Sequence, residues 1–128
     1  MSMHVLRVVR RTADFDAMLH FYRDLLGMTP VTNWDRPGDR GAILSPVAGA
    51  PAVEFEIMDT EGWTVEGVKP SNIEVSIEVD DADAWMARLA GAGVPIARGL
   101  ENTPWGHRSF GIDDPDGLRL WLYHVFAV

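Results

Sequence analysis

The sequence predicts an α+β fold made of two βαβββ modules, which form a cup-shaped mixed β-sheet with flanking helices. Alternating apolar and polar stretches, typical of strands, and one amphipathic helical stretch occur in the same order in both halves of the 128-residue chain. The two halves align so that Asp16 meets Asp83 and Arg7 meets Glu74. Near the end of the chain, the turn motif at 114–117 separates two alternating arms and predicts a closing β-hairpin.

The first module is expected over residues 1–58. It opens with a valine-rich strand at 4–10, and Thr12 or Asp14 can cap the helix that follows. Gly27 fits the position after this helix, where the backbone turns to positive φ. The apolar stripe of the helix contains Phe15, Met18, Leu19, Tyr22, Leu25 and Leu26. Three strands should follow, at 28–34, 41–46 and 51–58.

The second module is expected over residues 72–128, after a linker at 59–71 that shows no clear period. It opens with an alternating strand at 73–79, and Asp80 or Asp81 can cap the next helix. The apolar face of this helix contains Trp85, Met86 and Leu89, and glycines should end it at 91–93. A strand should begin at 94–97, and 100–106 is either a loop or a strand.

The closing hairpin offers the best candidate wall of a binding site. In the motif Asp114-Pro-Asp-Gly117, proline presets φ at the second position and glycine accepts positive φ. The arms should cover 107–113 and 118–126. One face of the second arm, expected on the core, carries Leu118, Leu120 and Leu122. The opposite face, expected to meet a ligand, carries Arg119, Trp121 and Tyr123.

Composition excludes several classes of function. Nineteen acidic and eleven basic side chains give a net charge of −8, which repels nucleic acid and anionic membranes and favours neutral or cationic ligands. The absence of cysteine excludes disulfides and thiolate chemistry. No apolar run reaches the roughly 18 residues of a membrane span, and the arginine-containing start does not read as a signal peptide. We therefore expect a single soluble, cytoplasmic domain whose partner is a small molecule, with no nucleic acid and no membrane.

Two motifs carry a resemblance to a known family. The stretch from Phe21 to Met28, Phe-Tyr-Arg-Asp-Leu-Leu-Gly-Met, resembles the first-helix signature of the vicinal oxygen chelate superfamily, which contains glyoxalase I, extradiol dioxygenases, fosfomycin-resistance enzymes and bleomycin-resistance proteins. Trp105-Gly106, Phe110 and the turn at 114–117 resemble its C-terminal signature, especially as bleomycin-resistance-like members carry it. The resemblance implies the glyoxalase/bleomycin resistance/dioxygenase fold over essentially the whole chain. It says less about function, because the superfamily runs several chemistries on one scaffold.

The resemblance also implies where a metal would bind. Metal-dependent members usually hold histidine in the first strand and glutamate in the last strand of each half, and these positions are Arg7, Glu56, Glu74 and Trp121 here. Arginine has no free lone pair and tryptophan offers only an N–H donor, so neither can ligate a cation. The two glutamates can still hold magnesium or manganese with help from water, with the arginine as a competing cation. We therefore predict no metal and no cofactor.

Charged residues of the first strands and of 51–58 are candidates for the site. Arg7 and Glu74 occupy equivalent places in the two modules, so they either form an ion pair, within one chain or between two, or contact the ligand. Glu54 and Glu56 share one face of their strand. They either meet solvent or anchor an ammonium or guanidinium group, and burial of one would also suit acid/base chemistry.

Aromatic residues complete the candidate site. The chain is rich in tryptophan outside the predicted helices, with Trp34, Trp63, Trp105 and Trp121. Their faces, near carboxylates, suit flat cationic ligands. His107 is expected to be a hydrogen-bonded structural residue or, as the alternative, a catalytic one. The candidate ligand-binding residues are Arg7, Trp34, Glu54, Glu56, Glu74, Trp105, His107, Trp121 and Tyr123.

The leading hypothesis for function is capture of a cationic or aromatic ligand in a cleft between the modules, without a metal. Such a protein would be closest to bleomycin-resistance-like proteins and hence to antibiotic resistance. The alternative is an enzyme on the same scaffold: a metal-dependent lyase, isomerase or dioxygenase, or a metal-free acid/base catalyst whose catalytic residues are unassigned. A regulatory module without a ligand is the least favoured hypothesis. We also expect a homodimer, because relatives with so short a chain commonly build each site from both subunits.

Overall fold

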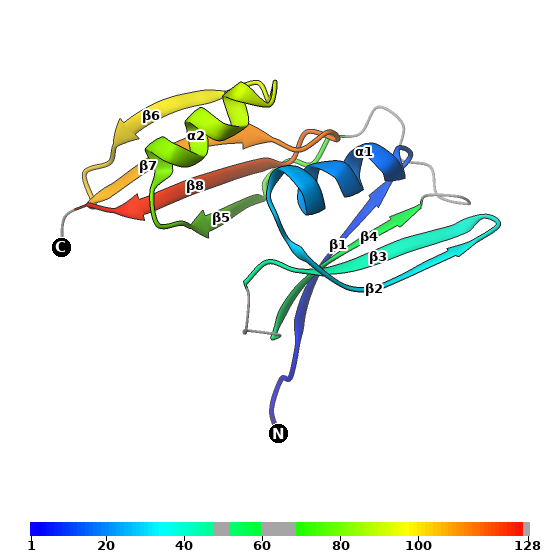
Figure 1. Cartoon of the computed structure of the whole chain (residues 1–128). Coiled ribbons are helices and arrows are strands. Elements are labelled where there is room, and N and C mark those ends of the chain that lie inside the picture. The colour runs from blue at the N-terminus through cyan, green and yellow to red at the C-terminus, as the bar shows by residue number, and fades with distance from the viewer. Residues whose placement is uncertain (48–51, 60–68, 127–128) are drawn as a thin grey trace. The chain divides into compact units, whose positions relative to one another are not determined.

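The computed structural model describes residues 1–47, 52–59 and 69–126 (Figure 1). The chain divides into two compact units, Met1–Val68 and Lys69–Val128, and each contains one four-stranded sheet. In the described ranges no helix is long and apolar enough to cross a membrane.

The first unit has one strand, a helical segment and then three strands. These elements are β1 (Leu6–Thr12), α1 (Phe15–Leu19), the π-helical segment η1 (His20–Leu25), β2 (Thr29–Arg36), β3 (Asp39–Ser45) and β4 (Val53–Asp59). The strands lie in the order β1-β4-β3-β2. Strands β1 and β4 are parallel, whereas the other two pairs are antiparallel, so the sheet is mixed.

The second unit repeats the same plan. Its elements are β5 (Glu74–Glu78), α2 (Ala82–Gly91), β6 (Arg98–Asn102), β7 (His107–Asp113) and β8 (Arg119–Val125). The strand order is β5-β8-β7-β6, again with a parallel pair of first and last strands (Figure 1). The predicted α+β fold, with two mixed sheets and a helix in each repeat, is confirmed.

The first helix departs from a regular α-helix. Asp14 caps it by accepting a hydrogen bond from a helix N–H at 3.1 Å, which confirms one of the two predicted caps. From His20 onward the helix widens, and the N–H of Leu26 bonds to the carbonyl of Phe21 at 3.0 Å. A π-helical turn holds an extra residue, so Phe21 and Tyr22, neighbours in the sequence, both become buried. The predicted apolar stripe contained Tyr22 and missed Phe21, because it assumed a regular helical period.

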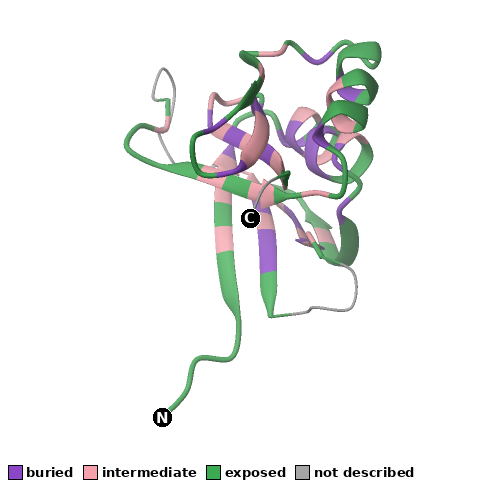
Figure 2. Cartoon of the chain, turned by 90° about the vertical axis from the view of Figure 1, so that its left-hand side faces the viewer, coloured by how far each residue is buried: buried purple, intermediate pink, exposed green. Residues whose placement is uncertain are grey.

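Strand β8 has one buried face and one partly open face. The side chains of Leu120, Leu122 and, just before the strand, Leu118 are no more than 2% exposed, and α2 contacts this strand (Figure 1). Between them, Trp121 and Tyr123 are only half-buried, and Figure 2 shows how buried and exposed positions mix along the strands. The predicted two-faced strand is confirmed.

The turn between β7 and β8 has the predicted chemistry. Asp114 Oδ1 accepts hydrogen bonds from the N–H groups of Asp116 and Leu118 at 2.9 and 3.0 Å. The N–H of Gly117 bonds to the carbonyl of Asp114 at 2.9 Å, and Gly117 has a φ of +94°. Side chains other than glycine avoid this conformation, so glycine at 117 stabilises the turn.

The strand predicted to begin at 94–97 is wrong. The N–H of Val94 bonds back to the carbonyl of Leu89 at 3.0 Å and completes the end of α2. Pro95 has no N–H to donate to a ladder, so pairing with β7 starts only where the N–H of Ala97 reaches the carbonyl of Gly111 at 2.9 Å. The strand β6 therefore begins four residues later, at Arg98, and the strand alternative for 100–106 holds only through residue 102.

The first strand and the linker also differ from the prediction. β1 spans Leu6–Thr12 rather than 4–10, because its pairing with β4 begins opposite Val53. Most of the predicted linker at 59–71 lies outside the described residues, and so does Trp63.

The buried face of β8 generates a stability prediction. Leu120→Ala should lower the free energy of unfolding by about 2–5 kcal/mol, because it leaves a cavity in a closed core. Val125→Ala is a matched control, since Val125 lies on the same strand and is 48% exposed; it should change stability by about 0.5 kcal/mol or less. Urea unfolding followed by circular dichroism measures both. Equal losses for the two variants would contradict the assigned faces.

Candidate functional site

One face of the second sheet gathers most of the predicted site residues. In the parallel pair of β5 and β8, Ser76 lies opposite Trp121. In the antiparallel pair of β7 and β8, Ser109 lies opposite Tyr123 and Gly111 lies opposite Trp121. Cross-strand partners share a face, so these side chains all project from the face opposite the leucines.

A cavity of about 450 Å³ lies on this face. Its lining consists of Glu74, Ser76, Glu101, Thr103, Trp105, His107, Ser109, Trp121 and Tyr123. The candidate residues from the sequence that meet here are Glu74, Trp105, His107, Trp121 and Tyr123. Cavities of roughly 300–1,000 Å³ with aromatic walls and few polar groups are typical of small-molecule sites. We name it the aromatic cavity.

Stacked rings form one wall of the aromatic cavity. The imidazole of His107 stacks on the ring of Tyr123, with centroids 4.1 Å apart and planes inclined by 11°. The ring of Trp105 meets His107 edge-on, with centroids 6.4 Å apart and planes at 73°. Trp105 is 69% exposed, so it offers apolar surface at the open side of the cavity. A flat ligand can extend this set of rings by stacking.

Backbone hydrogen bonds hold His107 in place. The hydroxyl of Thr103 accepts from the N–H of His107 at 3.0 Å and donates to its carbonyl at 3.1 Å. The N–H of Thr103 adds a 2.7 Å bond to the same carbonyl. These contacts favour the structural hypothesis for the backbone of His107, while its ring serves as part of the wall.

Trp121 is held on three sides. Its Nε1 donates a hydrogen bond to Oε2 of Glu74 at 2.9 Å. Its ring lies against the backbone of Gly111, where an added Cβ would come within 3.0 Å of the ring. The guanidinium of Arg119 lies over the ring, 5.3 Å from its centroid. Glycine at position 111 therefore permits the close approach that fixes the indole.

Four lining residues were not predicted: Ser76, Glu101, Thr103 and Ser109. Ser109 lies two residues from His107 on β7, so alternation along the predicted arm at 107–113 could have found it. Ser76 follows Glu74 by the same rule on β5. Glu101 lies on β6, whose start was predicted wrongly, so the sequence pattern did not assign it to this face.

In the first unit, Arg7 faces both predicted acidic anchors of β4. Its Nε and Nη2 donate to Oε1 of Glu54 at 3.1 and 2.8 Å, and its Nη1 lies 3.5 Å from Oε1 of Glu56. The side chains of Glu54 and Glu56 are only 11% and 13% exposed, so the hypothesis that they simply meet solvent is wrong. The hydrogen bond to Glu54 raises the pKa of Arg7 above its ordinary value, and the guanidinium stays charged.

Trp34 belongs to the first unit and lies over Gly41 of β3. Its Nε1 donates to Oδ1 of Asp39 at 2.9 Å. The cavity that it lines measures about 180 Å³, below the usual size of ligand pockets. A role of Trp34 in ligand binding stays a prediction.

The positions at which metal-dependent relatives hold their ligands carry hydrogen bonds between first and last strands here. Arg7 of β1 lies 3.5 Å from Glu56 of β4 and donates its hydrogen bonds to the neighbouring Glu54, which is not one of these positions. Trp121 of β8 donates to Glu74 of β5. In both units a carboxylate is paired with a side chain that cannot ligate a cation. These residues do not fit a metal centre of the family type. The predicted pairing of Arg7 with Glu74 would join the two units and stays a prediction.

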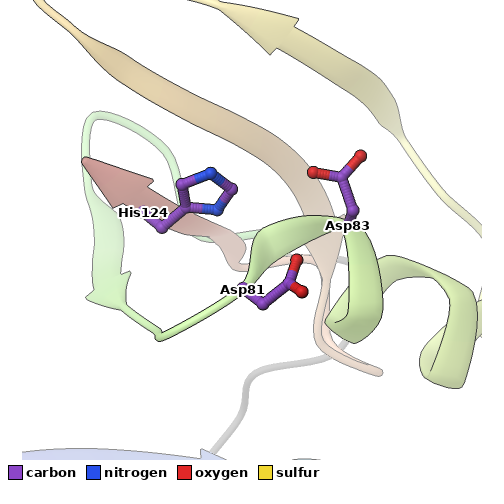
Figure 3. A group of neighbouring side chains, drawn as sticks. All are labelled: Asp81, Asp83 and His124. Atoms are coloured by element: carbon purple, nitrogen blue, oxygen red, sulfur yellow. The ribbon is translucent and has the colours of Figure 1, made fainter. Parts of the chain in front are cut away.

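A cluster of possible metal ligands lies elsewhere in the second unit, at the start of α2. Asp81, Asp83 and His124 place one ligand atom each within 4.8 Å of one another (Figure 3).

These atoms already have partners. His124 Nδ1 accepts from the N–H of Ala82 at 2.8 Å, and Asp81 caps the helix as predicted. Asp83 receives two hydrogen bonds from Arg108, which hold the pKa of this carboxyl below its ordinary value. The cluster thus ties α2 to β7 and β8.

Known proteins that are similar to this chain share its fold. A family model described as the Glyoxalase/Bleomycin resistance protein/Dioxygenase superfamily matches residues 4–122. The chain is 27% identical over 123 residues to the lactoylglutathione lyase of Haemophilus influenzae, which covers 92% of this chain and 90% of that protein. The lactoylglutathione lyase of Neisseria meningitidis serogroup A shows the same identity over 123 residues, covering 92% of this chain and 88% of that protein.

Solved structures share the fold. A superfamily member from Sphaerobacter thermophilus aligns with a TM-score of 0.74 and 25% identity, over 94% of this chain and 95% of that one. TnmS3, described as an antibiotic binding protein from Streptomyces sp. CB03234, aligns with a TM-score of 0.74 and 26% identity, over 95% of both chains. Since the family model spans both repeats, the resemblance seen in the sequence is confirmed, and the chain belongs to the Glyoxalase/Bleomycin resistance protein/Dioxygenase superfamily.

Proposed function

We propose that this protein captures a flat aromatic small molecule in the aromatic cavity, without a metal. The observation that carries the proposal is the stacked wall of His107 and Tyr123 beside the fixed indole of Trp121, in a cavity of about 450 Å³. Buried aromatic surface supplies affinity, and pre-ordered rings lower the entropy lost on binding. Similarity to TnmS3, an antibiotic binding protein, supports the same class of function.

The polar groups of the cavity suggest where a ligand donor binds. Trp121 engages Oε2 of Glu74, so Oε1 is the oxygen that can accept from a ligand N–H. Glu101 adds a second carboxylate on the same lining. An amine or ammonium attached to the aromatic part of the ligand would satisfy both. Glu54 and Glu56, by contrast, are poorly exposed and share the one positive charge of Arg7, so we rank them below Glu74 and Glu101 as anchors for an outside cation.

A second candidate function is catalysis. The curated relatives at 27% identity are named lactoylglutathione lyase, and the match spans 92% of this chain, which keeps an enzyme of the lyase class in view. The side chains at the family's ligand positions do not suit the metal that such an enzyme would use, because a charged guanidinium and an indole stand there. We therefore rank capture above catalysis. A lactoylglutathione lyase assay of the purified protein, with and without added nickel or zinc, tests this order.

The assembly and its setting are also proposals. We retain the homodimer, the cleft between the modules, the cytoplasmic location and a link to antibiotic resistance as predictions from the sequence. Every described residue that lines the aromatic cavity belongs to the second unit, so the proposal of capture there assumes none of them.

Removing one ring of the stacked wall should weaken aromatic ligands. Tyr123→Leu should lower the affinity for N-phenyl-1-naphthylamine, a neutral dye that fluoresces in apolar sites, by about two- to tenfold, because an aromatic pair contributes about 0.5–1.5 kcal/mol. Fluorescence titration gives the dissociation constant. Tyr22→Leu is not a suitable control because Tyr22 is core, so Val125→Ala on the same strand serves instead. A dye that binds both variants equally would contradict the site.

Removing the charge of Glu74 should weaken cationic aromatics selectively. Glu74→Gln keeps an oxygen for Trp121 Nε1, removes the negative charge and replaces the other oxygen with an NH2 group. Proflavine, a flat cation, should bind about two- to fivefold more weakly, as expected for a solvent-accessible charge pair, while the neutral dye, which has no charge to lose a partner, should be weakened less. Glu78→Gln, on the same strand and outside the cavity lining, is the control. Equal effects of the two substitutions on proflavine binding would contradict the assignment of Glu74 as the anchor.

The donor set also predicts how the protein responds to metals. Protein purified without chelator should hold far less than one equivalent of zinc, nickel, iron or manganese, and adding these ions should not raise its melting temperature. The physical reason is that Arg7 places a permanent positive charge beside Glu54 and Glu56. Elemental analysis and a thermal scan measure this. One tightly held metal per chain, together with lyase activity, would favour the enzyme.

A further inference from the structure

A second cavity of about 310 Å³ adjoins the aromatic cavity. The two share four lining residues, Glu74, Glu101, Ser109 and Trp121. The second cavity is also lined by Arg98, Gly99 and Arg119, which do not line the first. The ligand site therefore continues past Trp121 from an aromatic compartment into a polar one that contains two guanidinium groups. We name the latter the arginine compartment.

Trp121 lines both compartments. Its ring is fixed by the hydrogen bond to Glu74 and by its contact with the backbone of Gly111. Gly111 lies opposite Arg98 in the pairing of β6 with β7, and Ser109 lies opposite Glu101. The arginine compartment thus lies directly beside the indole, within reach of a substituent on a ring that stacks in the aromatic compartment.

The two arginines differ in what holds them. Arg119 donates to Oδ1 of Asp113 at 2.6 Å and lies over the ring of Trp121, so its charge is already paired with a carboxylate. The structure gives Arg98 no ion pair with any of the residues that it describes. Arg98 carries a permanent charge and a planar fork of N–H donors, which matches the two oxygens of a carboxylate, sulfonate or phosphate. In a site whose other charges are paired or acidic, Arg98 is the group suited to an anion.

We propose that the ligand is an aromatic molecule that also carries an acidic group, and that Arg98 anchors this group in the arginine compartment. This inference rests on the proposed function, because it assumes that the ring stacks in the aromatic compartment. It adds a second requirement to the ligand: a basic or N–H-bearing part for Glu74 and Glu101, and an acid for Arg98. The ligand class is thus an amphoteric aromatic compound rather than a simple cation.

A matched pair of dyes tests the proposal. N-phenyl-1-naphthylamine and 8-anilino-1-naphthalenesulfonate share the same rings and the same aryl N–H, and only the second carries a sulfonate. Arg98→Gln should weaken the sulfonated dye about two- to fivefold, as expected for loss of a solvent-accessible charge pair, and should leave the affinity for the neutral dye nearly unchanged. Arg98→Lys, which keeps the charge, should recover part of the affinity. Arg88→Gln on α2, outside both cavities, removes the same charge and should affect neither dye.

The outcomes distinguish this inference from the proposed function. If Arg98→Gln weakens both dyes equally or neither, while Tyr123→Leu weakens both, the anion anchor is wrong and aromatic capture stands. If Arg88→Gln weakens the sulfonated dye as much as Arg98→Gln does, the effect is long-range charge and the anchor is wrong. If Tyr123→Leu leaves both dyes unchanged, the proposed function fails, and the inference fails with it. Far-ultraviolet circular dichroism and melting temperature of Arg98→Gln should match the unmodified protein, because Arg98 is exposed.

Discussion

Burial of the leucines of β8 is the constraint on which the second unit depends. Leu120 and Leu122 are no more than 1% exposed, and burial of such a side chain contributes about 1.5–3 kcal/mol. A register slip of one residue would turn both leucines to the open face and push Trp121 into the core. The aromatic face is therefore fixed by the same free energy that holds the unit together. Binding residues placed on a core strand in this way need little reorganisation before a ligand arrives.

The internal repeat keeps a geometry and changes its chemistry. In both units a side chain on one strand of the parallel pair donates to a carboxylate on the other, yet the donor lies on the first strand in one unit and on the last strand in the other. The single positive charge of Arg7 faces two poorly exposed carboxylates, whereas the indole of Trp121 brings no charge to Glu74. A scaffold whose relatives hold metals at these positions here stabilises its sheets with hydrogen bonds. The carboxylate of Glu74 in the second unit therefore remains available to a ligand.

Much of the fold followed from local patterns, and the misses arise where the local pattern is broken or where the contact joins distant segments. Alternation in β8, the turn at 114–117 and the cap at Asp14 all rest on chemistry within a few residues, which a sequence displays directly. The π-helical turn that buries Phe21 beside Tyr22 breaks the helical period, so periodicity could not reveal it. The pairing of Arg7 with Glu54 depends on the register of two strands far apart in the chain, which no local pattern displays. Glu101 and Arg98 lie on β6. The prediction placed the start of this strand too early, in the residues that follow α2.

Charge acts on the proposed ligand at two ranges. The net charge of −8 repels anions at a distance, but salt screens this field beyond about 10 Å at 0.1 M ionic strength. Inside the cavities the lining groups dominate, and there Arg98 favours an acid while Glu74 and Glu101 favour a donor. A purely anionic aromatic would be attracted by Arg98 and repelled by both carboxylates. A purely cationic aromatic would be attracted by the carboxylates and repelled by Arg98. An amphoteric aromatic satisfies both compartments at once, so discrimination comes from the mismatched charge as much as from the matched one.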